Sequence, residues 1–438
     1  MRAQIQKHWY AIRTSYWFVP SLMVLGAVAL SIVTFAIDVA IGDHWPKMVT
    51  GFGLNTPAGA RAVLSTIAGS MITVAGVSFS ILIAAVVFAT GQLGPRLLAI
   101  FMADTSNKVT LGTFIATFLY GLLVLRTVHG GEDGERFVPH LGVLVALLLA
   151  LASLAVLISF IHHVPRSISA AQVVARIGAD LIERSAQLFP QRLGEAVAEG
   201  SSLANVATDL PSDAGIAIRA AGDGYITHVD LVSLADEIGK RDGVLQLRQP
   251  PGAFVSQGEV LATAHGIDAD ASLHDAVRTA IVLDTERTNQ QDYLFVVQQM
   301  VEIAIRALSP GINDPFTAIG CLDWLGSGAI QLGHREMPSK YRRDTDGKLR
   351  LVVPSFDFAD VTSAMFDRLR PYAASDRNAC LHTFATLTRV MREVAHPPYR
   401  AALLEQAAAL NDAAQQCLAL ERDRIAATAA YAALRDAA

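Results

Sequence analysis

The polar residues best suited to binding chemistry gather around the Ser-Pro-Gly-Ile-Asn-Asp-Pro stretch at residues 309–315. Asn313, Asp314 and Thr317 offer an amide, a carboxylate and a hydroxyl, and such oxygens are ligands for hard cations. If this stretch is a corner between two helices, it sets these three residues beside polar residues of the preceding helix. One interpretation of the corner is therefore a cation or small-ligand site. The preceding helix contributes Asp292, Gln298 and Glu302.

The same stretch has a purely structural interpretation. Pro310 and Gly311 stop a helix, Asp314 is placed to cap the next one, and Pro315 suits a first helical turn. Turn chemistry alone accounts for every residue type in the corner. The structural interpretation is favoured, and the ligand-binding interpretation stays open beside it.

A second set of residues follows one face of the apolar stretch between residues 62 and 95, which has no charged residue. Its small and hydroxyl-bearing members are three, four or seven residues apart, so on a helix they form a continuous seam. Such seams favour close packing against a neighbouring span or subunit. A pore-lining helix, with hydroxyls and glycines facing water, is the alternative. The seam consists of Ser65, Gly69, Thr73, Gly76, Ser80, Ala84 and Gly91.

Motifs of conventional catalysis are absent from the sequence. It has no phosphate-binding Walker loop, dinucleotide fingerprint, HExxH or GxSxG motif. Cys321, Cys380 and Cys417 are far apart, which is unlike a disulfide framework or a zinc site and favours a reducing compartment. The His162-His163 pair lacks the spaced partners of a metal site. The sequence therefore predicts no catalytic residue, no metal and no cofactor.

The elements that carry these residues divide into a membrane part and a remainder. Hydrophobic residues make up 52% and charged residues 17% of the 438 residues, against about 25% charged residues in soluble domains. Four stretches reach the roughly 20 apolar residues needed to cross hydrocarbon. No carboxylate or lysine lies mid-span, which disfavours proton-coupled pumping. The predicted spans are Phe18 to Ile37, Ala62 to Pro95, Val109 to Leu125 and Phe137 to Ile161.

Lys and Arg residues near the spans predict their orientation. The N-terminal tail, the loop between spans two and three and the segment after span four carry more of them than the opposite side. We therefore expect a multi-pass protein of the bacterial inner membrane, with both termini cytoplasmic and the acidic loop at residues 130–135 outside. The inner side has Arg2, Lys7, Arg13, Arg96, Lys108, Arg166 and Arg176, and the outer side has Lys47, Arg61 and Arg136.

The remainder of the chain combines helices with a short β-rich region. Beyond His163 it has 26 Lys/Arg and 34 Asp/Glu, and this acidic balance disfavours a nucleic-acid partner. Gly-rich turns separate short strands between Gly215 and Gly266. The run PPGAFVSQGEVLATA resembles half of a biotinyl/lipoyl-type barrel-sandwich module, without an evident acceptor lysine. A helix from Leu273 to Leu308 and Ala-rich C-terminal helices are predicted to follow.

We therefore predict a predominantly α membrane protein, with four transmembrane helices and a cytoplasmic α+β domain that contains a small barrel-sandwich-like β-module. Four segments make up this organisation. They are a transmembrane domain (1–165), an amphipathic stalk helix and linker (166–210), the β-module (211–267) and a mainly helical cytoplasmic domain (268–438).

Several pieces of the chain together resemble one bacterial family of uncharacterised predicted membrane proteins, domain of unknown function twenty-two fifty-four. The resemblance extends from near the N-terminus to about residue 325. It implies a membrane location and lends no chemistry. The matching pieces are WFVP, FATGQLGPRLLAIFM, LGTFIATFLYGLLVL, PPGAFVSQGEVLA and ALSPGINDPFTA.

Three hypotheses for function follow. The leading one is a homo-oligomeric channel or passive transport protein with a cytoplasmic regulatory domain, because the seam lies in a span and no energy-coupling motif is present. The alternative is a membrane-anchored sensor or scaffold that binds a ligand or partner through its cytoplasmic domain. An enzyme with an unfamiliar site at the corner is a weaker third. The expected partners are the lipid bilayer and further copies of the chain, and the sequence does not identify an ion or ligand.

Overall fold

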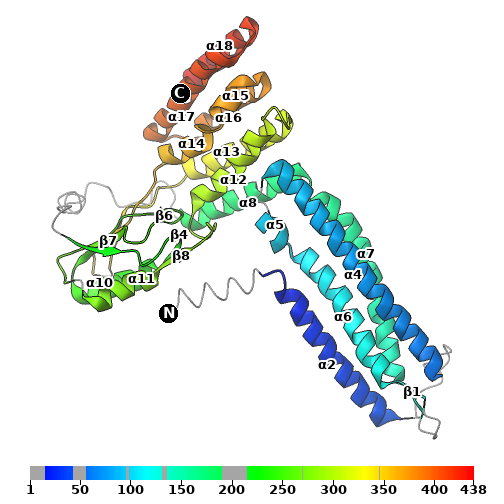
Figure 1. The fold of residues 1–438 in the computed structure, drawn as a ribbon. Coiled ribbons are helices and arrows are strands. Elements are labelled where there is room, and N and C mark those ends of the chain that lie inside the picture. The colour runs from blue at the N-terminus through cyan, green and yellow to red at the C-terminus, as the bar shows by residue number, and fades with distance from the viewer. Residues whose placement is uncertain are drawn as a thin grey trace. The chain divides into compact units, whose positions relative to one another are not determined.

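The computed structural model describes residues 15–42, 56–94, 98–130, 136–189, 215–268, 270–344 and 346–438. The chain forms two compact units, one ending at Gln172 and the other running from Val173 to Ala438 (Figure 1). Each unit has its own core and is described by itself.

The first unit is built from long apolar helices. Within the described residues, four helices are long and apolar enough to cross a membrane, and each contains most of one predicted span. Residues 131–135 of the predicted outer loop lie outside the described residues, and the short strands β1 (His129–Gly130) and β2 (Arg136–Phe137) flank them. The four helices are α2 (Phe18–Ile41), α4 (Pro57–Leu93), α6 (Thr105–Thr127) and α7 (His140–Ser167), and α5 (Leu98–Ala103) is a short helix after α4.

Helix α6 is the centre of this unit and packs against α2, α4 and α7. Glycines mark the closest approaches. A Cβ atom on Gly112 would lie 2.6 Å from the Met23 sulfur of α2, and one on Gly121 would lie 3.5 Å from the Ala68 Cβ of α4. Small residues allow this approach between membrane helices. Close packing within the chain is therefore organised around α6.

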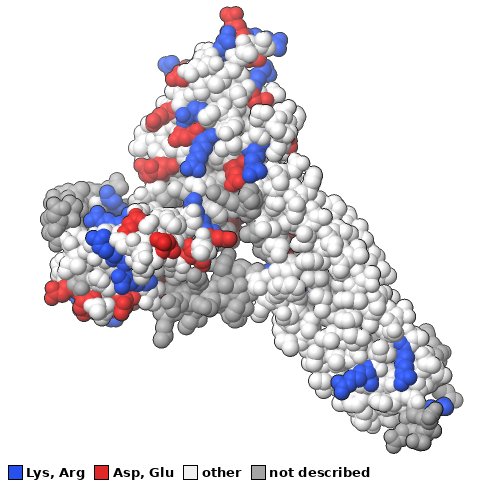
Figure 2. All heavy atoms as spheres, in the orientation of Figure 1, with Lys and Arg blue, Asp and Glu red and all other residues white. Residues whose placement is uncertain are grey.

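Helix α4 is longer than a bilayer requires. Its 37 residues extend over roughly 55 Å at the helical rise, against a hydrocarbon core of about 30 Å. A helix of this length tilts or extends beyond the hydrocarbon. Figure 2 shows the surface of this unit as a broad band without charge, with Lys and Arg near one end.

In the second unit, helix α13 (Pro315–Gly333) is packed against α8, α12, α14 and α16. Its glycines admit the neighbours, since Gly328 lies against Leu181 of α8 and Gly326 against Thr386 of α16. On the same contact between α8 and α13, Trp324 of α13 packs on Gly178 of α8. The helices around it are α8 (Ala170–Leu188), α12 (Tyr293–Ala307), α14 (Phe358–Phe366), α15 (Arg370–Ser375), α16 (Arg377–Glu393), α17 (Pro397–Cys417) and α18 (Glu421–Asp436).

Two open sheets complete this unit. One has the order β3-β7-β5-β10-β9, with β10 parallel to β5, and the other has the order β6-β4-β8. Helices α10 (Leu231–Arg241) and α11 (Ala271–Ala280) share the apolar core of the sheets. The strands are β3 (Ile216–Arg219), β4 (Gly224–Val229), β5 (Val244–Leu247), β6 (Phe254–Val255), β7 (Val260–His265), β8 (Ile281–Asp284), β9 (Tyr341–Arg343) and β10 (Leu349–Val352).

The sheets differ from the predicted module. The barrel-sandwich prediction is not confirmed, because the described strands form no closed barrel and β8, β9 and β10 from outside 211–267 complete the two sheets. The prediction of a single helix from Leu273 to Leu308 is wrong, because the strand β8 divides this segment. Residues of β8 pair with residues of β4 more than 50 positions earlier. That pairing overrides the local helical pattern of the segment.

Aspartates begin many helices of the second unit. Among the described helices of this unit, six have an Asp at the N-cap whose side chain accepts a backbone N–H, and this accounts for part of the acidic composition. Carboxylates satisfy the free N–H groups of a first turn and oppose the helix dipole. The caps are Asp230, Asp270, Asp292, Asp314, Asp357 and Asp376.

The contact between α8 and α13 gives a matched test. Gly178→Ala adds a methyl group against the Trp324 indole, so we expect a loss of about 1 to 3 kcal/mol in the free energy of unfolding. Gly239→Ala, in α10 with open space around it, should gain up to about 1 kcal/mol from helix propensity. Unfolding of the purified variants in detergent measures both. Equal effects would contradict the close packing of α8 on α13.

Candidate functional site

The predicted seam lies on the outward face of α4. Ser65, Gly69, Thr73, Gly76, Ser80, Ala84 and Gly91 are all exposed. A Cβ atom on Gly69, Gly76 or Gly91 would meet no atom of the described residues within 4 Å. The seam therefore does not pack against another span of the same chain.

This exposure contrasts with the glycines that do join helices in the same unit. Gly112, Gly121 and Gly142 each face a neighbouring helix, and a Cβ on Gly142 would lie 2.8 Å from the Val124 side chain. Packing within the chain thus uses the glycines of α6 and α7. The seam residues of α4 face outward instead.

Two of the three seam hydroxyls bond to their own helix. Thr73 Oγ1 donates to the Gly69 carbonyl and Ser80 Oγ donates to the Gly76 carbonyl, each at 2.9 Å. Back-bonding satisfies the hydroxyl proton in an apolar medium. Each oxygen keeps acceptor capacity that a partner helix or water can use.

A buried carboxylate joins two spans at one end of this unit. Asp38 of α2 is 1% exposed, and its two oxygens accept the Leu141 and Gly142 N–H groups, each at 2.9 Å. These are free amides of the first turn of α7, whose own N-cap residue, Pro139, provides no side-chain bond. Asp38 is therefore the N-terminal cap of α7, supplied by another helix.

At the predicted ligand corner, the structure shows a capped turn. Asp314 accepts the Thr317 N–H at 3.1 Å and the Thr317 hydroxyl at 2.6 Å. Asn313 has a positive φ of 51°, a conformation that asparagine tolerates better than most residues. Phe316 beside them is 80% exposed. These contacts are those of a helix start, and a ligand at Asn313, Asp314 and Thr317 stays a prediction.

The other predicted corner residues lie elsewhere. Asp292 begins α12, and the 15 residues of that helix place it roughly 22 Å from the corner. Glu302, nearer the corner, faces Arg306 at 3.6 Å across one helical turn. The structure therefore brings Asn313, Asp314 and Thr317 together and leaves Asp292 at the opposite end of α12.

Asp292 belongs to a buried ion pair that sequence reasoning missed. Arg287 Nε donates to its carboxylate at 3.0 Å, and Arg287 Nη1 donates to Gln298 Oε1 at 2.7 Å. Burial raises the pKa of the Asp292 carboxyl, and Arg287 and the Phe295 N–H act against that rise. Gly252, at a φ of 90°, closes over the carboxylate. The only sequence signal was a Thr-Glu-Arg-Thr run in a segment predicted as helix.

The remaining candidate groups offer little reactivity. Burial raises the pKa of the Cys321 thiol, and it raises the pKa of the Cys380 thiol to about 11. Both thiols are therefore protonated at neutral pH. His163 Nε2 lies 3.2 Å from the Asp104 carboxylate that caps α6. Among the described residues, no group of three or more His, Cys, Asp or Glu side chains could hold a metal ion.

Comparisons with known proteins place the chain in a family of predicted membrane proteins. Residues 13–389 match the family described as "Predicted membrane protein (DUF2254)". The chain belongs to this family. Uncharacterised proteins of Mycobacterium bovis and Mycobacterium tuberculosis are 30% identical over 419 residues, which cover 94% of this chain and 78% of each relative. No solved structure matches the chain.

Two aspartates of α12 and α13 can be compared directly. Asp314→Ala removes one helix cap, and we expect a loss of about 1 kcal/mol in the free energy of unfolding. Asp292→Ala also leaves the partly buried Arg287 guanidinium without its carboxylate, and we expect a larger loss of about 2 to 4 kcal/mol. Denaturant unfolding in detergent gives both values. A larger loss for Asp314→Ala would mean that the corner does more than cap α13.

Proposed function

We propose that the chain is a homo-oligomeric channel or passive transport protein of the bacterial inner membrane, with a cytoplasmic regulatory domain. The observation that carries the proposal is the outward-facing seam of α4. A continuous strip of exposed glycines and hydroxyls on a span is poorly explained by lipid contact alone. Copies of α4 that meet along this seam would supply the pathway that a four-helix monomer lacks.

The spacing of the seam suits association between copies. Ser65, Gly69 and Thr73 are four residues apart, and so are Gly76, Ser80 and Ala84. Two such small-xxx-small blocks in succession are typical of close contacts between membrane helices. Large exposed residues border the seam, including Ile72, Val77 and Ile81, and these suit the surrounding lipid.

The proposed orientation, with both termini cytoplasmic, depends on Lys and Arg counts. Arg126 weakens the bias, because it lies in the last turn of α6, at the end where Arg61 donates to the Val128 carbonyl. The predicted outer side then has four such residues against seven on the inner side. The excess still favours cytoplasmic termini.

A membrane-anchored sensor or scaffold is the second candidate. One observation favours it, which is that the Thr73 and Ser80 hydroxyls are already satisfied by their own helix. Such hydroxyls do not require water. On this view the seam is an assembly contact, and the unit from Val173 onward performs the function.

Ion flux through reconstituted protein separates the two. Gly76→Leu fills the seam of α4, and we expect it to abolish most of the flux while leaving the monomer folded, since open space surrounds Gly76. Gly26→Leu is the matched control, because Gly26 of α2 is equally exposed with nothing within 4 Å. Flux in liposomes containing the two variants and the unchanged protein is the measurement.

Comparison with the Gly26→Leu control decides whether the pathway follows α4. Equal flux from both variants would contradict a pathway along α4. No flux from the unchanged protein under any ion gradient would favour the sensor or scaffold.

A further inference from the structure

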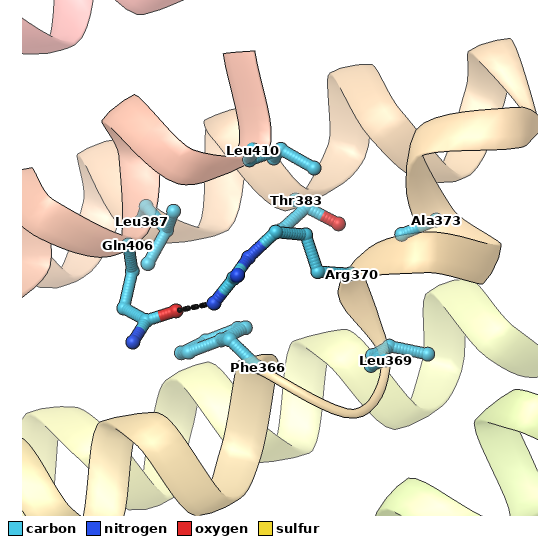
Figure 3. Close-up of a pocket in the computed structure, with 8 residues that line it drawn as sticks. All are labelled: Phe366, Leu369, Arg370, Ala373, Thr383, Leu387, Gln406 and Leu410. Atoms are coloured by element: carbon cyan, nitrogen blue, oxygen red, sulfur yellow. Dashed lines mark hydrogen bonds between the residues drawn. The ribbon is translucent and has the colours of Figure 1, made fainter. Parts of the chain in front are cut away.

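The interior between the C-terminal helices is closely packed. The pocket drawn in Figure 3, among α15, α16, α17 and the end of α14, has a cavity volume of about 10 Å³. That is room for about one water molecule, and Arg370 Nη2 already donates to Gln406 Oε1 there at 3.1 Å. The outward face of the last helix, α18, is different, because exposed charged and apolar side chains meet on it.

Helix α18 is held on the second unit by its inner face. Figure 1 shows it at an outer edge of this unit, and it packs against α16 and α17. Asp423 pairs with Arg377 of α16 at 3.0 Å, and Ala427 and Leu434 are fully buried. These contacts fix which side of α18 faces outward.

Five exposed side chains form one line along that outward side. They are four, three, four and three residues apart, a spacing that keeps them on one face of a helix. A charge stands at each end of the line, and a large apolar, a hydroxyl-bearing and a small side chain lie between the charges. We call this line the α18 stripe, and it consists of Glu421, Ile425, Thr428, Ala432 and Arg435.

The charges of the α18 stripe have no partner within the described part of the chain. Neither the Glu421 carboxylate nor the Arg435 guanidinium makes an ion pair or hydrogen bond there, and Arg435 lies only over the ring of Tyr431 of its own helix. Ile425 between them is 62% exposed. An open groove of about 490 Å³ lies beside Ile425, lined by α18 and by Gln415 of α17.

The order of the α18 stripe is complementary to itself when it is reversed. If two copies pair antiparallel about Thr428, Glu421 of one copy lies level with Arg435 of the other, because both are seven residues from Thr428. Ile425 then faces Ala432, whose small side chain leaves room for it. A two-fold axis repeats each of these contacts, as an interface between identical copies requires.

The same charges disfavour the parallel alternative. A parallel pair would set Glu421 against Glu421 and Arg435 against Arg435, and like charges across a contact repel. Two residues on one flank of the α18 stripe agree with the antiparallel order. Arg422, which is 81% exposed, and the exposed Asp436 also come opposite each other in that order.

We propose that α18 is a contact between two copies of this chain, which pair antiparallel about a two-fold axis at Thr428. The contact belongs to the second unit and needs no pathway along α4, so either proposal can fail without the other. Specific interfaces bury roughly 1,200 to 2,000 Å², and one pair of 16-residue helices is small by that measure. Confinement of the copies to one membrane raises their effective concentration, which offsets weak pairing.

Disulfide cross-linking in native membranes tests the α18 contact. The exposed Cys417 is first replaced by serine, because Cys321 and Cys380 are buried. Thr428→Cys then places a thiol of each copy at the proposed axis, within the about 7 Å between α carbons that a disulfide spans. Ala433→Cys is the matched control, because Ala433 is exposed on the same helix outside the α18 stripe. We expect covalent dimers from Thr428→Cys and few from the control.

Exchange of charges tests the direction of pairing. Glu421→Arg sets two arginines against each other at both ends of the contact, so the dimer yield of Thr428→Cys should fall roughly two- to ten-fold at low salt. Arg435→Glu should have the same effect, and the two changes together should restore the yield. Both positions are exposed, so the fold tolerates these changes.

Three results would overturn the α18 contact. The first is a dimer yield from Thr428→Cys no greater than that from Ala433→Cys. The others are single charge changes that leave the yield unaltered, and a double variant that fails to recover it.

Discussion

Backbone amides inside a membrane must find partners within the protein, and the capping of α7 by Asp38 is the clearest instance of that constraint here. The carboxylate of α2 reaches N–H groups more than 100 residues later. Beside it, Thr34 bonds Tyr120, and Tyr120 donates to the Gly142 carbonyl. One end of α2, α6 and α7 is thus joined by polar contacts that hydrocarbon makes costly to break.

The contacts that join the spans within the chain do not involve the seam of α4. The spans within the chain are joined by Asp38, by the glycines of α6 and α7, and by a buried Thr117–Ser153 hydroxyl pair. None of these joints uses the small residues on the outward face of α4. The second unit follows a similar plan, with aspartate caps at its helix starts and glycines where α13 meets its neighbours.

Local patterns predicted the local features of this fold. The four spans, the cap at Asp314 and the Ala-rich C-terminal helices follow from hydropathy, turn residues and helical spacing. Contacts between distant residues were beyond such patterns. The strand β8 depends on pairing with β4, and β10 joins β5 from about 100 residues away. The cap at Asp38 likewise forms only when separate segments meet, and so does the cover that Gly252 gives to the Asp292 carboxylate.

Disulfide cross-linking in native membranes tests most directly whether copies of α4 meet along the seam. Cys321 and Cys380 are buried, so replacing the exposed Cys417 by serine leaves a quiet background. Two α carbons must come within about 7 Å to be bridged. If copies of α4 meet there, mild oxidation of Gly76→Cys yields covalent dimers and that of Gly26→Cys on α2 does not. Dimers from Gly26→Cys alone, or from neither variant, would contradict that contact.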